Sequence, residues 1–294
     1  MKAFIFPGQG SQFPGMGHDL YQSSKKAKDL FELANSILGF NMSKIMFEGT
    51  DDELKQTNIT QPAIFIHSAI LSECIHIQPD MVAGHSLGEF SALVSAKAIS
   101  FEDGLQLVVK RAKAMQLACE TTNSVMAAII GLDGSIIEKC CDDHTGIVVP
   151  ANYNSPNQIV ISGERTAIEE ICNTLNNIGA KRTVILPVSG AFHSPIMNSA
   201  KQNLEAAIFD TQFKTPTCPI YQNVHAKGVT DESELKENLI QQLTSPVKWF
   251  QTIEQMVQDN ATEFFEVGPG NVLSGLNRRI NKEIKCVKAQ ISNT

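Results

Sequence analysis

Hydrophobic positions along the chain follow two spacings, one typical of buried strands and one typical of amphipathic helices. Short strands are predicted at residues 2–6, 81–83 and 263–267, and each is followed by a glycine-containing turn. Elsewhere apolar residues recur every three or four positions, as on one face of a helix. The spacing predicts helices over residues 20–38, 62–74, 88–96, 100–119, 231–243 and 246–258, and a last one ending at residue 280. This alternation predicts an α/β fold with a parallel sheet.

Two of these helices carry signals for where they begin. Pro62 stands at the expected first turn of its helix. Backbone N–H groups in that turn have no partner within the helix, so proline loses no helical hydrogen bond there. Ser100 precedes the helix over 100–119, and Asp103 follows it at the spacing of a capping box.

Residues 121–188 form a block with its own pattern. The elements expected there are strand 125–132, helix 136–141, strand 146–152, strand 158–162, helix 165–178 and strand 181–186. This β-α-β-β-α-β order is ferredoxin-like. Because α/β character resumes afterwards, the block is predicted to be an inserted subdomain. Residues 1–120 and 189–294 then form the large α/β domain.

Composition and charge narrow the class of protein. The 294 residues are 43% hydrophobic and 19% charged, which is typical of a globular protein with a substantial core. No apolar run reaches the 18 or more residues of a membrane helix, and the run at 3–6 is too short for a signal peptide. A cytoplasmic protein without a membrane partner is expected. The net charge of −7 argues against nucleic-acid binding.

Cysteine and histidine spacing gives no sign of a metal or of disulfides. The seven cysteines include no Cys-x-x-Cys pair, and two of them, Cys140 and Cys141, are adjacent. The seven histidines include no His-Glu-x-x-His spacing. We therefore expect reduced, mostly buried thiols and no metal site.

The stretch Gly84-His85-Ser86-Leu87-Gly88 follows the short strand at 81–83 and precedes a predicted helix. A Gly-x-Ser-x-Gly pattern between a strand and a helix is typical of a nucleophile elbow, in which the serine hydroxyl projects at the edge of the sheet. Both residue types are common, so a small serine in a crowded turn is the alternative. Ser86 is the candidate nucleophile.

A serine nucleophile needs a base, and His193 is the first candidate. It lies just past the predicted insertion, and the order serine then histidine fits an elbow enzyme. A capped or core imidazole is the alternative. His85 is the second candidate, although neighbours on a tight turn point apart. No acidic third member is evident, since Glu205 and Asp210 fall in an apparent amphipathic helix. A backbone carbonyl could fix the imidazole tautomer instead.

Two further features could bind an anion. Arg111 borders the apolar stripe of the helix over 100–119, where a half-buried guanidinium can bind a carboxylate through two parallel hydrogen bonds. A surface ion pair is the alternative, and Lys113 borders the opposite edge of the stripe. The turn Gly8-Gln9-Gly10 lacks the other residues of a phosphate loop. Its backbone N–H groups could stabilise an oxyanion.

Seven stretches together resemble one family, the malonyl-CoA:acyl carrier protein transacylases. They are FPGQGSQ at 6–12, GHSLGE at 84–89, KRAKAM at 110–115, NSPNQIVISG at 154–163, AFHS at 191–194, QQLTSPVKW at 241–249 and EVGPGNVLSGL at 266–276. The likeness spans nearly the whole chain in family order. The family includes stand-alone enzymes of fatty-acid synthesis and the acyltransferases of polyketide synthases.

The resemblance implies that residues 1–120 and 189–294 form an α/β-hydrolase-like catalytic domain, and it implies a role for each candidate residue. Ser86 would be the nucleophile and His193 its base, oriented by the backbone carbonyl of Gln242. Arg111 would clamp the free carboxylate of malonate. The oxyanion hole would come from the backbone N–H groups of two residues, which are Gln9 and Leu87.

The implied reaction is a ping-pong transfer of malonyl from malonyl-CoA to the phosphopantetheine thiol of an acyl carrier protein, without a cofactor and by a monomer. Leu87 and Phe192 resemble the pattern of malonyl-selective members. The pathway, fatty-acid or polyketide synthesis, stays open. An acyl-thioester hydrolase on the same fold is the rival hypothesis; hydrolytic relatives lack the arginine that is present here as Arg111. A non-catalytic carrier-protein scaffold is a third.

Overall fold

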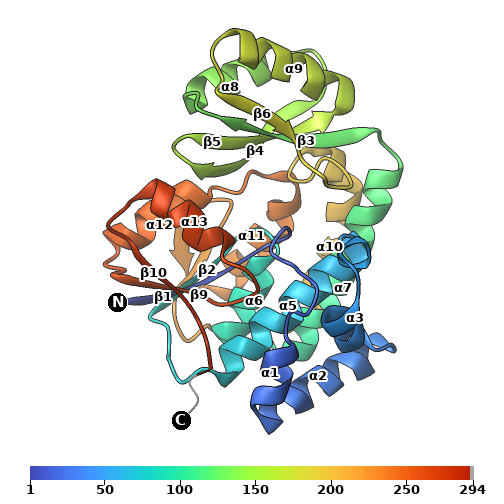
Figure 1. Cartoon of the computed structure of the whole chain (residues 1–294), viewed down its shortest axis with the longest axis vertical. Helices are drawn as coiled ribbons and strands as arrows, with labels where there is room; N and C mark the ends of the chain where they lie inside the picture. The colour runs from blue at the N-terminus through green and yellow to red at the C-terminus, as the bar shows by residue number, and fades with distance from the viewer. Residues whose placement is uncertain (292–294) are drawn as a thin grey trace.

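A computed structural model describes residues 1–291 of the chain and arranges them around two sheets (Figure 1). The larger sheet has the strand order β10-β9-β1-β2-β7-β8. Its strands are β1 (Lys2–Phe6), β2 (Met81–Gly84), β7 (Ile220–Gln222), β8 (Lys227–Val229), β9 (Glu263–Glu266) and β10 (Lys285–Lys288). Neighbouring strands are parallel except for the antiparallel hairpin of β7 and β8.

Helices cover both faces of this sheet. They are α1 (His18–Ser23), α2 (Lys25–Leu38), α3 (Met42–Glu48), α4 (Asp51–Leu54), α5 (Thr57–Cys74), α6 (Gly88–Ser95), α7 (Phe101–Glu120), α10 (Asn198–Asp210), α11 (Glu232–Gln241), α12 (Trp249–Gln258) and α13 (Val272–Ile280). Two 3₁₀ turns, η1 (Pro195–Met197) and η2 (Gln242–Thr244), join them. Phe4 and Phe6 of β1 pack into the core on one side of the sheet, and Ala3 and Ile5 pack against Trp249 on the other. Burial on both faces explains why the central strands are continuous apolar runs.

The second sheet is antiparallel and has the order β4-β5-β3-β6. Its elements are β3 (Ser124–Ile130), α8 (Gly134–Asp142), β4 (Val148–Ser155), β5 (Gln158–Glu164), α9 (Arg165–Asn177) and β6 (Arg182–Ile185). Alternate residues of β3, such as Val125 and Ile129, pack under α8 and α9, while Met126 joins the core shared with the larger sheet. Figure 1 shows this lobe above the larger sheet, with α8 and α9 on its far side.

The predicted fold class is confirmed: an α/β architecture with a parallel sheet carries a ferredoxin-like β-α-β-β-α-β unit. The domain boundaries at 120/121 and 188/189 stay a prediction. Within residues 1–291, no helix combines the length and the apolarity needed to span a bilayer.

Three predicted helix boundaries were wrong. The helix expected over 20–38 is two helices, because the side chain of Ser24 caps the second through the N–H of Ala27 at 3.1 Å. The helix expected from Pro62 begins five residues earlier, at Thr57, so the proline lies inside it. An interior proline leaves the carbonyl four residues before it without a donor, and here that residue, Asn58, is exposed.

The helix expected from residue 246 begins at Trp249 instead, because the residues before it pair with the second sheet. The N–H of Val247 donates to the carbonyl of Ala151 at 2.8 Å, and the N–H of Tyr153 donates to the carbonyl of Val247 at 2.9 Å. Backbone groups used in this bridge cannot also form the first turn of a helix. The bridge ties the two lobes together.

Candidate active site

Ser86 lies on a sharp turn between β2 and α6, at the carboxyl edge of the larger sheet. Its φ of 52° is in the left-handed region, which is uncommon for a residue with a side chain. Both flanking residues must be glycine, because neighbouring backbone atoms leave no room for a side chain. A Cβ at Gly84 would lie 1.9 Å from the carbonyl carbon of Gly88, and a Cβ at Gly88 would lie 2.1 Å from the carbonyl oxygen of Phe6. The strand, turn and helix therefore have the arrangement of a nucleophile elbow.

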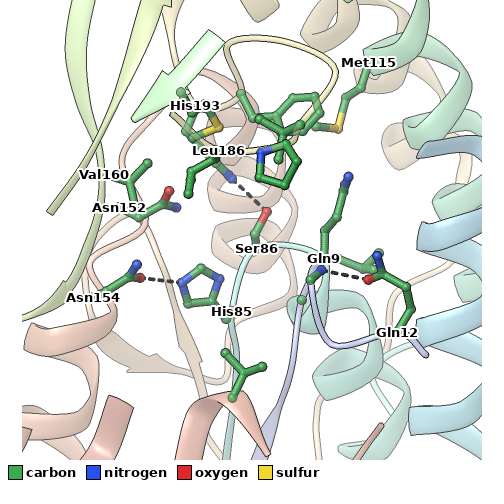
Figure 2. Close-up of a pocket in the computed structure, with 18 of the residues that line it drawn as sticks. Gln9, Gln12, His85, Ser86, Met115, Asn152, Asn154, Val160, Leu186 and His193 are labelled. Atoms are coloured by element: carbon green, nitrogen blue, oxygen red, sulfur yellow. Dashed lines mark hydrogen bonds between the residues drawn. The ribbon is translucent and has the colours of Figure 1, made fainter. Parts of the chain in front are cut away.

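His193 lies within hydrogen-bond distance of this serine, with 2.7 Å between Ser86 Oγ and His193 Nε2 (Figure 2). The other ring nitrogen, Nδ1, is 2.9 Å from the carbonyl oxygen of Gln242 and 3.2 Å from that of Ser245. Both partners are acceptors, so Nδ1 carries the proton and Nε2 accepts from the hydroxyl. Burial, aided by the charge of Arg111, lowers the pKa of His193 to about 3. The imidazole is therefore neutral at pH 7 and able to take a proton.

Arg111, from α7, is buried beside the same hydroxyl. Its Nη2 donates to Ser86 Oγ at 2.9 Å and to Gln242 Oε1 at 3.1 Å, and its Nη1 donates to Gln61 Oε1 at 2.8 Å. Burial lowers the pKa of Arg111 to about 10, so the side chain remains a cation at neutral pH. Lys113, the other candidate on this helix, is exposed. The arrangement places a cation that could bind an anion beside the candidate nucleophile.

The two predicted oxyanion donors lie around the same cleft as Ser86. The turn that carries Gln9 packs against the elbow, since a Cβ at Gly8 would lie 2.5 Å from the carbonyl oxygen of His85. Leu87 precedes the first turn of α6, where the partial positive charge of a helix favours an anion. Within residues 1–291, neither the Gln9 N–H nor the Leu87 N–H is engaged by another backbone group outside the regular elements.

His85 points away from the hydroxyl, as expected of a neighbour on a tight turn (Figure 2). Its Nε2 is 2.8 Å from Oδ1 of Asn154, on β4, and its ring centroid is 5.5 Å from that of Trp249. Burial lowers the pKa of His85. Its hydrogen bond to Asn154 links the elbow to the second sheet. Glu205 and Asp210 lie on α10 and form no hydrogen bond with His193.

Sequence reasoning missed three polar residues that surround the site. Gln61 and Asn223 are neutral amides without a motif of their own. The side chain of Asn223 bridges the elbow: its Oδ1 accepts from the N–H of Ser86 at 2.7 Å, and its Nδ2 donates to the carbonyl of Gly84 at 2.6 Å. Burial raises the pKa of Glu89, on α6, to about 8, and an acidic residue within an apolar helix was the one available signal.

The cleft between the lobes encloses about 470 Å³. Its floor carries Ser86, His193 and Arg111. Its walls include apolar side chains from the second sheet and the segment after it, which are Met126, Val160, Leu186, Val188 and Phe192. Among the residues that the structure describes, no group of three or more His, Cys, Asp or Glu is placed to hold a metal ion.

Comparisons with known proteins agree with this geometry. The model of the acyl transferase domain family matches residues 3–290. The malonyl CoA-acyl carrier protein transacylase of Staphylococcus aureus (strain COL) is 39% identical over 292 residues, covering 98% of this chain and 95% of the relative. The chain therefore belongs to the acyl transferase domain family and, within it, to the malonyl-CoA:acyl carrier protein transacylases.

Solved structures show the same architecture. The acyl carrier protein S-malonyltransferase from Vibrio cholerae O1 superposes with a TM-score of 0.95 at 38% identity, covering 99% of this chain and 97% of that one. A malonyl-transacylase described in complex with a type II PKS acyl-carrier protein superposes with a TM-score of 0.95 at 35% identity, covering 99% and 96%.

The tight packing of the elbow yields a first prediction. Replacing Gly84 with alanine should destabilise the fold by several kcal/mol, the range of severe overpacking, because backbone atoms block the new methyl group. Gly275→Ala is the matched control, since a Cβ there meets nothing within 4 Å. Chemical denaturation would measure both variants. Equal stability of Gly84→Ala and wild type would contradict the described turn.

The environment of His193 yields a second prediction. Nitrogen NMR of the imidazole, assigned by its loss in His193→Gln, should show the neutral form with a proton on Nδ1 from pH 8 down to pH 5. Protonation should begin only as the pH approaches the lowered pKa of about 3. Titration near 6.5, the ordinary value of histidine, would show that the ring is not buried as described.

Proposed function

We propose that this chain transfers malonyl groups from malonyl-CoA to the phosphopantetheine thiol of an acyl carrier protein, through an acyl-enzyme on Ser86. One observation carries the proposal: a single hydroxyl oxygen lies 2.7 Å from a neutral imidazole and 2.9 Å from a buried guanidinium. The imidazole suits proton removal, and the guanidinium suits a substrate that bears a second, free carboxylate. The names of the relatives support the same reaction.

The first half-reaction acylates the enzyme. His193 Nε2 takes the proton of Ser86 as its Oγ attacks the thioester carbonyl of malonyl-CoA. The tetrahedral oxyanion accepts hydrogen bonds from the N–H groups of Gln9 and Leu87, each contributing roughly 10²–10³-fold in rate. The C–S bond then breaks, and the histidine gives its proton to the departing CoA thiolate.

The second half-reaction reverses these roles. His193 removes the proton of the pantetheine thiol, the sulfur attacks the malonyl ester, and the Ser86 oxygen leaves with the proton. A docked carrier brings its thiol to the ester by proximity, which favours transfer over attack by water. The relative described in complex with a carrier protein supports this acceptor. The residues present complete this chemistry without a cofactor.

Arg111 selects the substrate in this proposal. Its guanidinium is already held by Gln61 and Gln242, so it is oriented before malonate arrives. A carboxylate takes up the donor that now faces Ser86 Oγ and frees that oxygen for attack. An acetyl group leaves the buried cation without an anion, which penalises its binding. Phe192, buried at the cleft wall, restricts the room for a branched malonyl group.

Intact-mass spectrometry tests the function directly. After mixing with malonyl-CoA, the protein should gain one malonyl group on Ser86, and Ser86→Ala should gain none. The adduct should persist in buffer and discharge onto a holo carrier protein. Rapid loss to water, with no transfer, would favour the thioester hydrolase. Several carrier proteins tested in parallel would assign the pathway.

Replacing Arg111 with alanine should lower malonyl loading by about 10²-fold, the effect of losing hydrogen bonds to a charged group. Acetyl loading should hold or rise, because no unpaired cation remains in the cleft. Lys113→Ala, two residues along the same helix and exposed, is the control and should load normally. Malonyl loading that survives Arg111→Ala would remove the clamp from the mechanism.

His193→Ala should slow acylation by roughly 10²–10⁴-fold at neutral pH, as expected for loss of a general base. Single-turnover mixing with malonyl-CoA gives the rate constant. An unchanged rate would assign the proton transfer to another group, and His85 is the second candidate.

A further inference from the structure

Glu89 is a buried carboxyl that the proposed reaction does not use. It lies in the first turn of α6, three residues after Ser86, with 1% of its surface exposed. A buried carboxyl group is costly unless its oxygens are hydrogen-bonded. Each oxygen of Glu89 accepts from a different part of the chain. Oε1 accepts from the backbone N–H of Asn223, and Oε2 accepts from Nε2 of Gln242 at 2.7 Å.

Gln242 is the first of these two links. Its Nε2 also donates to the backbone carbonyl of Ser86 at 2.9 Å, and its Oε1 accepts from Arg111. These partners leave one orientation for the amide, with nitrogen toward the carboxyl group and oxygen toward the guanidinium. The backbone carbonyl of the same residue accepts from His193 Nδ1. A shift of Gln242 therefore moves the anchor of the imidazole.

Asn223 is the second link. Its backbone N–H is held by Glu89, while its side chain bridges the backbone of Gly84 and Ser86. The carboxyl group thus reaches the serine through one oxygen and the histidine through the other. The hydrogen bonds in both chains of contacts are buried or part-buried, and hydrogen bonds are electrostatically stronger in a low-dielectric interior than in water.

We propose that Glu89 is a positioning residue that holds the Ser86 turn and the His193 anchor in register, so that the hydroxyl and the imidazole meet at 2.7 Å. It touches no reacting atom. Its action passes through Gln242 and Asn223. The proposal rests on the acyl transfer proposed above, although its test also has a part that does not depend on malonyl-CoA.

The variant that tests this role is Glu89→Gln. The amide has nearly the same size, but its NH₂ group faces an N–H donor where an oxygen accepted before, so one link is lost. The matched control is Glu266→Gln. Glu266 is equally buried and accepts from the N–H groups of Leu273 and Ser274, and it forms no hydrogen bond with Ser86, His193 or Arg111.

The rate of labelling by an uncharged fluorophosphonate measures the reactivity of Ser86 and His193 alone, because this probe has no carboxylate for Arg111 to bind. Ser86 Oγ forms a bond to phosphorus as fluoride leaves, and His193 takes the hydroxyl proton. Labelling of Glu89→Gln should be slowed at least tenfold, toward the about 10²-fold that a misplacement of ~1 Å can cost. Glu266→Gln should label within threefold of wild type. Labelling of Glu89→Gln at the wild-type rate, or an equal loss in Glu266→Gln, overturns the proposal.

Single-turnover acylation by malonyl-CoA separates positioning from substrate binding. In Glu89→Gln the maximal rate constant should fall by a factor similar to that for the fluorophosphonate. The half-saturating concentration should change less than threefold, because Gln61 still holds Arg111. A loss confined to the half-saturating concentration contradicts the role. If wild-type protein labels with fluorophosphonate but never acquires malonyl, the proposed function fails while the Glu89 test still stands.

Should Glu89→Gln fail to fold, Glu89→Asp provides the second variant. The shorter side chain keeps a carboxyl group but cannot reach both Asn223 and Gln242. Its fluorophosphonate labelling should be slower than wild type by several-fold or more, with a far-UV spectrum and an unfolding transition that show a folded protein. Wild-type labelling by folded Glu89→Asp overturns the proposal.

Discussion

The structure depends on one oxygen atom that takes part in two hydrogen bonds of opposite sense. Ser86 Oγ donates to a neutral imidazole and accepts from a buried guanidinium. In the proposed reaction, the first contact prepares the hydroxyl to lose a proton, and the second presents a cation beside the atom that would carry the acyl group. The proposed reaction needs both contacts, because the imidazole removes the proton of the hydroxyl and the guanidinium recognises the free carboxylate of malonyl.

The constraints around this oxygen come from four distant parts of the chain. The parallel strands bring the turn after β1 and the elbow after β2 to one edge of the sheet, as open α/β sheets do. The histidine arrives from the segment after β6, and the carbonyls that orient it belong to η2 and the residue after it. The bridge between Val247 and the second sheet ties those carbonyls to the smaller lobe. The cleft and the hydrogen-bonded pair of Ser86 and His193 therefore depend on the same inter-lobe contacts.

Sequence reasoning predicted the elements that periodicity and capping define, such as β1, the helix after Ser100 and the ferredoxin-like order. It failed where tertiary contacts determine the residue at which a helix begins. The start of α12 is displaced by strand pairing, and the true start of α5 is hidden behind a proline that ordinarily marks a first turn. In the site, Ser86 could be placed because the Gly-x-Ser-x-Gly motif carries that information. The helical wheel left Arg111 and Lys113 open, and only the family resemblance favoured Arg111. Asn223 and Gln61 could not be placed, because an amide becomes informative only when its partners are known.

A crystal structure of the malonyl-loaded protein tests the central claim most directly. The account predicts continuous density from Ser86 Oγ to a malonyl group, with the carbonyl oxygen within hydrogen-bond distance of the Gln9 and Leu87 nitrogens and the free carboxylate paired to Arg111. Density on another side chain, or a carboxylate directed away from the guanidinium, would contradict it.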